Sequence, residues 1–148
     1  MRLVKVALGA VNTTVGAFGS NVDKAIAMAT AMAKDGATVA LFPEQLVGGY
    51  PSEDLIQWHT FVDRQWGELL RFAHETAHLP LASVLGVTVA HQGLRYNCAA
   101  MISCGRIWGL VPKEKLPTYN VFYEGRTLTQ GYPAMRAAVS GVPLGDFV

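Results

Sequence analysis

The start of the chain predicts a strand, a helix and a second strand, and this order constrains the fold more than any other feature. Residues 3–11 and 37–42 are short apolar runs rich in Val, Leu and Ala. The stretch between them has the apolar spacing of a helix that ends near Lys34, and Ser20 or Asn21 is placed to cap its start. Short joints between such elements are typical of a βαβ unit with parallel strands. We therefore expect an α/β fold.

The remainder of the chain continues this alternation without a linker or an internal repeat, so we expect one domain. Helical periodicity from Ser52 to about His78, with a break near His59, predicts a second helix that Pro80 ends. Cys104-Gly105 suits a tight turn between two antiparallel strands. The further predicted strands are residues 81–90, 96–103, 106–111 and 135–142.

Composition excludes several classes of function. The net charge of +1 provides no basic field, so we expect no nucleic-acid partner. No apolar run approaches the roughly 18 residues of a membrane span. Residues 1–11 are broken by Lys5 and lack a small-residue cleavage site, so we interpret them as a strand and not as a signal peptide. These features favour a cytoplasmic protein with no membrane partner.

The cysteines and histidines predict neither a disulfide nor a metal site. Cys98 and Cys104 flank a turn, which would allow a disulfide, but two cysteines in an apolar strand context favour reduced thiols. His74 and His78 are four residues apart and can share a helix face. No third ligand lies near them in the sequence, so we expect no metal.

Glu44 follows the second predicted strand directly, in the string Phe42-Pro43-Glu44. Ligands of open α/β sheets bind beyond the carboxyl ends of the strands, so this carboxylate stands where chemistry is usually found. A carboxylate in that position can act as a general base. The alternative is a solvated glutamate at the start of a loop.

A second candidate site is the segment from Pro112 to Arg126, which follows the predicted hairpin. It gathers two lysines, two prolines, three aromatic residues, two glutamates and an arginine. Pro117 prevents a continuous helix or strand across it. A polar, aromatic loop at the end of a strand commonly presents binding and catalytic groups, although an ordinary solvated surface loop would have the same composition.

The order of these strings resembles the nitrilase superfamily of carbon–nitrogen hydrolases. The strings are Leu-Phe-Pro-Glu, then Gly-Tyr-Pro-x-Glu-Asp-Leu at residues 49–55, Tyr96-Asn97, and Lys-x-x-Leu-Pro-x-Tyr-x-x-Phe-x-Glu-x-Arg at residues 113–126. The last string narrows the resemblance to the N-terminal glutaminase domain of the glutamine-dependent NAD synthetase family. The resemblance extends from the first strand to about Gly131.

The resemblance implies a fold and a reaction. The fold is a nitrilase-like α-β-β-α sandwich, of which this chain would form the N-terminal half only. The reaction is hydrolysis of the glutamine side-chain amide by a Cys-Glu-Lys triad, which releases ammonia for NAD biosynthesis. Carried over by position, Glu44 is the general base and Lys113 is the triad lysine. Lys115 is a less favoured alternative, because it does not have the family's spacing to Leu116-Pro117.

The resemblance also implies which residues bind glutamine. Tyr119 matches a glutamine-binding position, and Phe122 and Glu124 match pocket positions. Glu124 is suited to the ammonium group of the substrate. Tyr50 is expected to line the pocket, although a packed loop aromatic is an equal alternative.

The chain departs from the family pattern in one respect. The family places its nucleophilic cysteine after the lysine loop, and the sequence reaches Val148 without one. Cys98 precedes Lys113, so we interpret it as a strand residue, and Cys104 as a turn residue. Residues 1–148 are therefore expected to be a partial glutaminase domain, inactive alone and needing no cofactor. The ATP- and Mg-dependent synthetase domain would be absent.

Half a sandwich would leave an uncovered apolar sheet face, which invites association, so a homo-oligomer is expected. Two other functions remain open from the sequence. One is a free-standing amidase of the same superfamily that acts on another amide. The other is a non-catalytic α/β module that only associates with partners.

Overall fold

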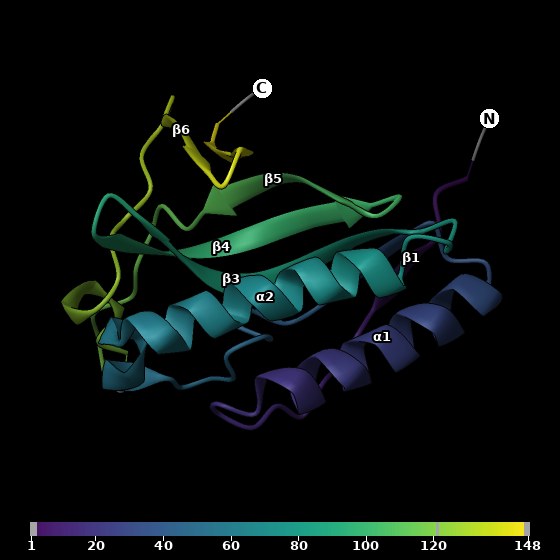
Figure 1. The fold of residues 1–148 in the computed structure, drawn as a ribbon, viewed down its shortest axis with the longest axis horizontal. Coiled ribbons are helices and arrows are strands. Elements are labelled where there is room, and N and C mark those ends of the chain that lie inside the picture. Colours follow the sequence, from purple (N-terminus) through teal and green to yellow (C-terminus); the bar gives the residue numbers. More distant parts are fainter. Residues whose placement is uncertain (1–2, 121, 147–148) are drawn as a thin grey trace.

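A single mixed sheet with helices packed against it makes up residues 3–120 and 122–146, the parts of the chain that the computed structural model describes (Figure 1). The sheet has seven strands in the order β1-β2-β3-β4-β5-β7-β6. In chain order the elements are β1 (Val6–Leu8), α1 (Phe18–Lys34), β2 (Val39–Leu41), the 3₁₀ helix η1 (Glu53–Gln57), α2 (His59–Glu75), β3 (Ala82–His91), β4 (Leu94–Ser103), β5 (Arg106–Pro112), the 3₁₀ helix η2 (Glu124–Arg126), β6 (Arg136–Val139) and β7 (Val142–Gly145).

The βαβ unit is confirmed, since β1 pairs in parallel with β2 and β2 in parallel with β3. Both of its strands are shorter than predicted, and α1 begins earlier, at Phe18. The predicted caps are wrong, because no side chain caps this helix. Asn21 is instead buried inside its first turns, where its amide group bonds the main chain of Thr14 and Val47. The Asn21 side chain therefore makes a tertiary contact, whereas the sequence predicted that it would cap its own helix.

The second predicted helix is interrupted as expected. Trp58 has extended backbone angles between η1 and α2, which confirms the break near His59. The helix ends at Glu75, earlier than the predicted His78. Over the described ranges, no helix is long and apolar enough to cross a membrane.

The hairpin of β4 and β5 is confirmed, and its turn residues Cys104 and Gly105 both have positive φ. The single strand predicted over residues 135–142 is wrong. Ser140 and Gly141 have φ of 49° and 80°, and they turn the chain into a second hairpin, β6–β7. Two successive residues with positive φ are the geometry of a tight hairpin turn. The first strand of that hairpin, β6, ends at Val139, whereas the sequence predicted that the strand would continue to Val142.

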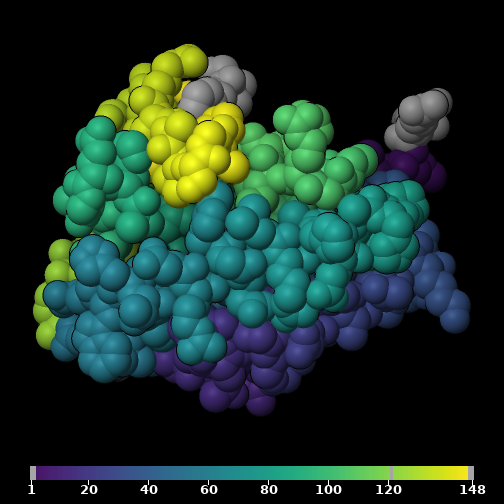
Figure 2. Space-filling view, in the orientation of Figure 1, coloured from purple at the N-terminus to yellow at the C-terminus, as the bar shows by residue number. Residues whose placement is uncertain are grey.

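One face of the sheet is covered by both helices. Leu85, Ala100 and Ile102 from the central strands share a buried cluster with Leu69 and Phe72 of α2. Figure 2 shows α1 and α2 as adjoining bands across one side of the molecule. The observed structure is therefore one helical layer on one sheet, two of the four layers of the predicted sandwich.

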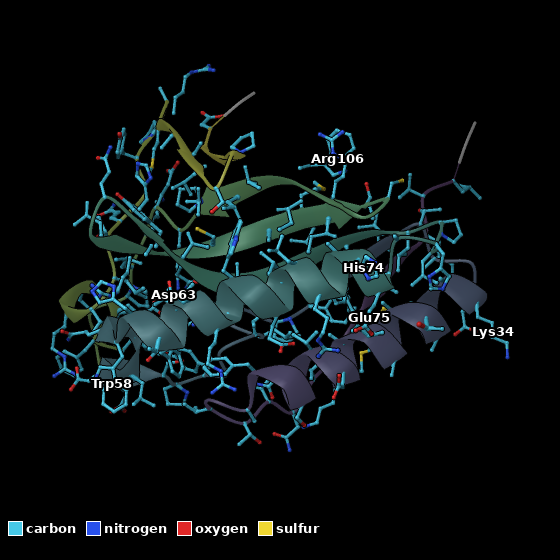
Figure 3. All side chains as sticks on the ribbon, in the orientation of Figure 1. Lys34, Trp58, Asp63, His74, Glu75 and Arg106 are labelled. Carbon is cyan, nitrogen blue, oxygen red and sulfur yellow. The ribbon has the colours of Figure 1, made fainter. Side chains whose placement is uncertain are left out.

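The other face of the sheet carries exposed apolar side chains. Leu8 pairs with Leu41, and Leu41 shares the partner Val84 with Met101, so these residues form a row across the strands. Leu8 is 77% exposed and Met101 47%. Figure 3 shows Arg106 on this side, away from α2. This is the uncovered apolar face that the sequence predicted.

An ion cluster joins the two helices at their outer surface. The Arg71 guanidinium donates to Glu68 and Glu75 of its own helix, and it also pairs with Asp23 of α1 at 2.9 Å. Figure 3 shows Glu75 beside α1 near the end of α2. Exposed ion pairs of this kind contribute little each, so the helices are held mainly by the apolar cluster beneath.

The core and the candidate site are connected through Phe72, which generates a prediction about stability. Phe72 is fully buried and meets Phe42, two residues before Glu44, edge to face with ring centroids 6.1 Å apart. We expect Phe72→Ala to lower the free energy of unfolding by about 3–5 kcal/mol, because it removes a large core side chain. Leu70→Ala in the same helix is the control, because Leu70 is 48% exposed and should cost much less. Urea unfolding followed by circular dichroism measures both, and equal losses would contradict this assignment of the core.

Candidate active site

Glu44 is held in a turn that is fastened to β3. The main-chain oxygen of Pro43 accepts from the Gly86 N–H at 3.2 Å, and the Val47 N–H donates to the Gly86 oxygen at 3.2 Å. Gln45 adopts a left-handed conformation, with φ of 49°. These contacts turn the chain sharply after β2 and leave the Glu44 side chain half exposed beyond the end of the strand.

Gly86 is the residue that lets this turn lie against the sheet. A Cβ at position 86 would lie 2.3 Å from the nitrogen of Gln45 and 2.5 Å from the oxygen of Pro43. Both are backbone atoms, so no side-chain rotation could relieve the overlap. The position of Glu44 therefore depends on glycine, which has no side chain, at position 86 of the neighbouring strand.

Lys113 lies where β5 ends, between β4 and the returning chain. Its N–H donates to the main-chain oxygen of Asn97 at 2.8 Å, and its own oxygen accepts from the Gly131 N–H at 2.9 Å. The backbone of this lysine is thus fixed on both sides. Only its side chain, 28% exposed, extends toward Glu44.

The Lys113 ammonium group bridges two carboxylates. Its Nζ donates to Oε1 of Glu44 at 2.7 Å and to Oε2 of Glu124 at 2.9 Å. Glu124, at the start of η2, is only 7% exposed. Burial lowers the pKa of Lys113, but the hydrogen bonds and negative charges of the two glutamates outweigh it, so the pKa is raised. We call these three residues the Glu44–Lys113–Glu124 cluster.

A cleft of about 490 Å³ opens over this cluster. Its lining includes all six residues that the sequence singled out, namely Glu44, Lys113, Tyr119, Phe122, Glu124 and Tyr50. The rings of Tyr119 and Phe122 meet edge to face, with centroids 5.7 Å apart. Lys115 is not part of the lining, which favours Lys113 as the functional lysine. The part of the lining that includes Lys113, Tyr119 and Phe122 follows the end of β5 and leads into η2.

A second cleft of about 460 Å³ adjoins the first and shares Tyr50 and Glu124 with it. Arg126 also lines it, paired with Asp54 at 2.7 Å. Burial, followed by the negative charges of Glu124 and Glu44, raises the pKa of Tyr50. Its phenol therefore stays neutral, as a donor, between the two clefts.

Neither cysteine belongs to the site. Cys98 lies in β4 and Cys104 in the turn after it, as predicted. Cys98 is buried in the cluster under the helices, and burial raises the pKa of its thiol to about 12. A thiol in that state is a poor nucleophile. Within the described ranges, no group of three or more His, Cys, Asp or Glu residues is arranged to hold a metal ion.

The sequence missed the role of Asn97, which it noted only as part of a string. Its side-chain amide donates to Oε1 of Glu44. It is also buried, at 3% exposure. The available signal was a polar amide directly before the apolar run of residues 98–102.

Comparison with solved structures identifies the fold. The chain superimposes on the amidase of Nesterenkonia sp. AN1, a nitrilase-superfamily protein with an active-site cysteine, with a TM-score of 0.74 at 18% identity, over 95% of this chain and 55% of the amidase. It superimposes on a glutamine-dependent NAD(+) synthetase from Cytophaga hutchinsonii with a TM-score of 0.89 at 22% identity, over 97% of this chain and 25% of the synthetase. The structure therefore has the fold of the nitrilase-superfamily carbon–nitrogen hydrolases.

Sequence comparison is more specific. The chain is 38% identical over 128 residues to the glutamine-dependent NAD(+) synthetase of Mycobacterium tuberculosis strain H37Rv, an alignment that covers 86% of this chain and 19% of the synthetase. No protein-family model matches the chain. The chain is thus related to the glutamine-dependent NAD(+) synthetases, as the sequence strings indicated. It spans about a fifth of the length of this relative.

The contact between Gly86 and the Glu44 turn generates a second prediction. Gly86→Ala should lower the free energy of unfolding by about 3 kcal/mol or more, because the added methyl group overlaps backbone atoms that cannot move independently. Gly67→Ala is the matched control, since nothing lies within 4 Å of a Cβ there and alanine favours the helix by up to about 1 kcal/mol. Urea unfolding measures both variants. A Gly86→Ala chain as stable as the unmodified one would contradict the close approach.

The two thiols should differ sharply in reactivity, which is a third prediction. At pH 8 an aromatic disulfide reagent should modify exposed Cys104 within minutes. Cys98 should react only after unfolding, since it is buried and almost wholly protonated. Absorbance of the released thiolate counts the groups. Two fast thiols in the folded chain would show that Cys98 is accessible.

Proposed function

We propose that residues 1–148 form part of a carbon–nitrogen hydrolase domain that releases ammonia from glutamine for NAD biosynthesis. The observation that carries this proposal is the Glu44–Lys113–Glu124 cluster at the base of a cleft. The relationship to glutamine-dependent NAD(+) synthetases supports glutamine as the amide. A synthetase portion that uses ATP and Mg would belong to the rest of the full-length protein.

The chemistry requires a thiol, and in this proposal the thiol comes from a cysteine other than Cys98 and Cys104. Glu44 takes the thiol proton, because a free cysteine is only slightly ionised near neutral pH. The thiolate adds to the carbon of the side-chain amide, and the carbon–nitrogen bond breaks as Glu44 returns the proton to the departing nitrogen. Ammonia and a glutamyl thioester result. Water, deprotonated by Glu44, then attacks the thioester and yields glutamate and the free thiol.

Lys113 supplies positive charge for these reaction steps. The tetrahedral intermediate carries a negative oxygen that fixed donors in a sheltered cleft stabilise. Lys113 has a raised pKa, so its ammonium group stays charged throughout. Its 2.7 Å contact with Glu44 keeps that charge beside the group that moves the protons.

The remaining cleft residues would hold the amino-acid part of the substrate. Tyr119 and Phe122 offer aromatic surface for the two methylene groups of glutamine. Glu124 gives Oε2 to Lys113, which leaves Oε1 for the substrate ammonium group. Tyr50 lies between the two clefts and can donate its phenol hydrogen.

Homo-oligomerisation and a cytoplasmic location are part of the same proposal. The exposed row that includes Leu8, Leu41 and Met101 favours association, because a large apolar surface in water is unfavourable. The net charge of +1 gives no reason to expect a nucleic-acid partner.

The proposal is tested in the protein translated from its native reading frame. Glu44→Gln should reduce ammonia release from glutamine by about 10³-fold, because it removes the general base. Lys113→Met should reduce it by about 10²–10³-fold, because it removes the charge that stabilises the intermediate. Lys115→Met is the control for loss of a lysine and should keep near-normal activity. A coupled glutamate dehydrogenase assay measures the ammonia, and full activity in Glu44→Gln would refute the proposal.

A substrate series distinguishes glutamine from other amides. The same protein should hydrolyse glutamine far faster than acetamide, propionamide or asparagine, since only glutamine has both the charged end and the right length. Hydrolysis of the simple amides without hydrolysis of glutamine would favour a free-standing amidase. The absence of any amide hydrolysis would favour a non-catalytic association module.

A further inference from the structure

Asn97 of β4 contacts both partners of the proposed catalytic pair. Its side-chain Nδ2 donates to Oε1 of Glu44, and its main-chain oxygen accepts from the Lys113 N–H at 2.8 Å. Glu44 follows β2 and Lys113 follows β5, so one residue of β4 links two segments that are 69 positions apart in sequence.

The burial of Asn97 requires an explanation. The side chain is 3% exposed, and a buried amide is unfavourable unless it is hydrogen-bonded. Side chains alternate along a strand, so Asn97 lies on the opposite face of β4 from Tyr96 and Cys98, which pack in the apolar core. The bond to Glu44 is a reason for the amide that packing does not supply.

The two donors that reach Glu44 act on the same oxygen. Asn97 Nδ2 and Lys113 Nζ both donate to Oε1. Among residues 3–120 and 122–146, no hydrogen bond to Oε2 of Glu44 is formed. The carboxylate is therefore held through one oxygen while the other is left to accept a proton. With Lys113 as its single donor, the carboxylate could rotate about that hydrogen bond. A second donor, from Asn97, restricts this rotation.

We propose that Asn97 is a positioning residue for the Glu44–Lys113 pair, fixing the carboxylate so that Oε2 is the oxygen that exchanges protons. This inference rests on the proposed role of Glu44 as general base. Asn97 does not touch the reacting atoms in this account. It acts through Glu44 by its side chain and through Lys113 by its main chain.

The state of Lys113 gives a direct readout, because Glu44 is one of the groups that raise its pKa. Asn97→Ala frees the half-exposed Glu44 carboxylate, so part of its attraction for Lys113 is lost and the pKa of Lys113 should fall. Asn97→Asp introduces a second carboxylate beside the same oxygen, so the pKa of Lys113 should rise. Glu124 and Tyr50 face the ammonium group in every variant, so their effects on the pKa of Lys113 are common to all of the titrations that are compared. The two substitutions thus have opposite expected signs.

The experiment is an NMR pH titration of the 148-residue chain with ¹⁵N-labelled lysine, with Lys113 assigned by its loss in Lys113→Met. Thr88→Val is the matched control. Thr88 is paired directly with Asn97 across the sheet and is equally buried, but its hydroxyl has no hydrogen-bond partner in the described residues. Thr88→Val should leave the Lys113 titration unchanged. If Asn97→Ala does not fold, Asn97→Ser takes its place, because serine is too short to reach Glu44 and carries the same expected fall.

A fall in Asn97→Ala with a rise in Asn97→Asp supports the proposal. An unchanged titration in Asn97→Ala would overturn it. Shifts in the same direction in both variants, or an equal shift in Thr88→Val, would also overturn it, since they would indicate general loosening of the strand. The readout is the lysine and not ammonia release, so a failure to hydrolyse glutamine would contradict only the proposed function.

Discussion

The sharing of one lysine by two glutamates is the interaction on which the candidate site depends. A partly buried ammonium group is unfavourable alone, and in this cleft burial by itself would lower the pKa of Lys113. Glu44 and Glu124 reverse that effect and keep the lysine charged. In turn, Lys113 is the only partner that the Glu124 carboxylate has among residues 3–120 and 122–146, and that carboxylate is otherwise almost fully buried. Each charged group in the cluster therefore lowers the free-energy cost of burying its neighbour. Removal of any one of the three would leave the remaining charges poorly compensated.

The scaffold brings these three charges together from distant parts of the chain. The sheet places the ends of β2 and β5 near β3 and β4, and the loop after β5 returns to present Glu124 in η2. Two residues that carry no charge make this possible. Gly86 lets the Glu44 turn lie against β3, and Asn97 joins Glu44 to the backbone of Lys113. The site is thus built into the sheet and does not rest on flexible loops alone.

Much of this arrangement could be predicted from the sequence, because local patterns encode it. The βαβ unit follows from apolar periodicity, and the hairpin of β4 and β5 from the turn at Cys104-Gly105. The approach of Glu44 to Lys113 came from the order of family-like strings, since nothing local links positions so far apart. The cap of α1 was wrong because Asn21 serves a tertiary contact. The break in the predicted strand over residues 135–142 was missed because the apolar run was continued across Ser140-Gly141, although a residue followed by glycine had predicted the turn at Cys104-Gly105. Gly86 and Asn97 were missed because strand periodicity indicates a face of the sheet and not what lies against it.

The central claim is that Glu44, set by this network, activates a thiol to attack glutamine. The most direct test is rapid-quench intact mass spectrometry of the protein from its native reading frame, mixed with glutamine. The account predicts a transient mass increase of one glutamyl group on a cysteine other than Cys98 and Cys104, with little adduct formed in Glu44→Gln. Ammonia release without such an adduct, or an adduct on Cys98, would contradict it.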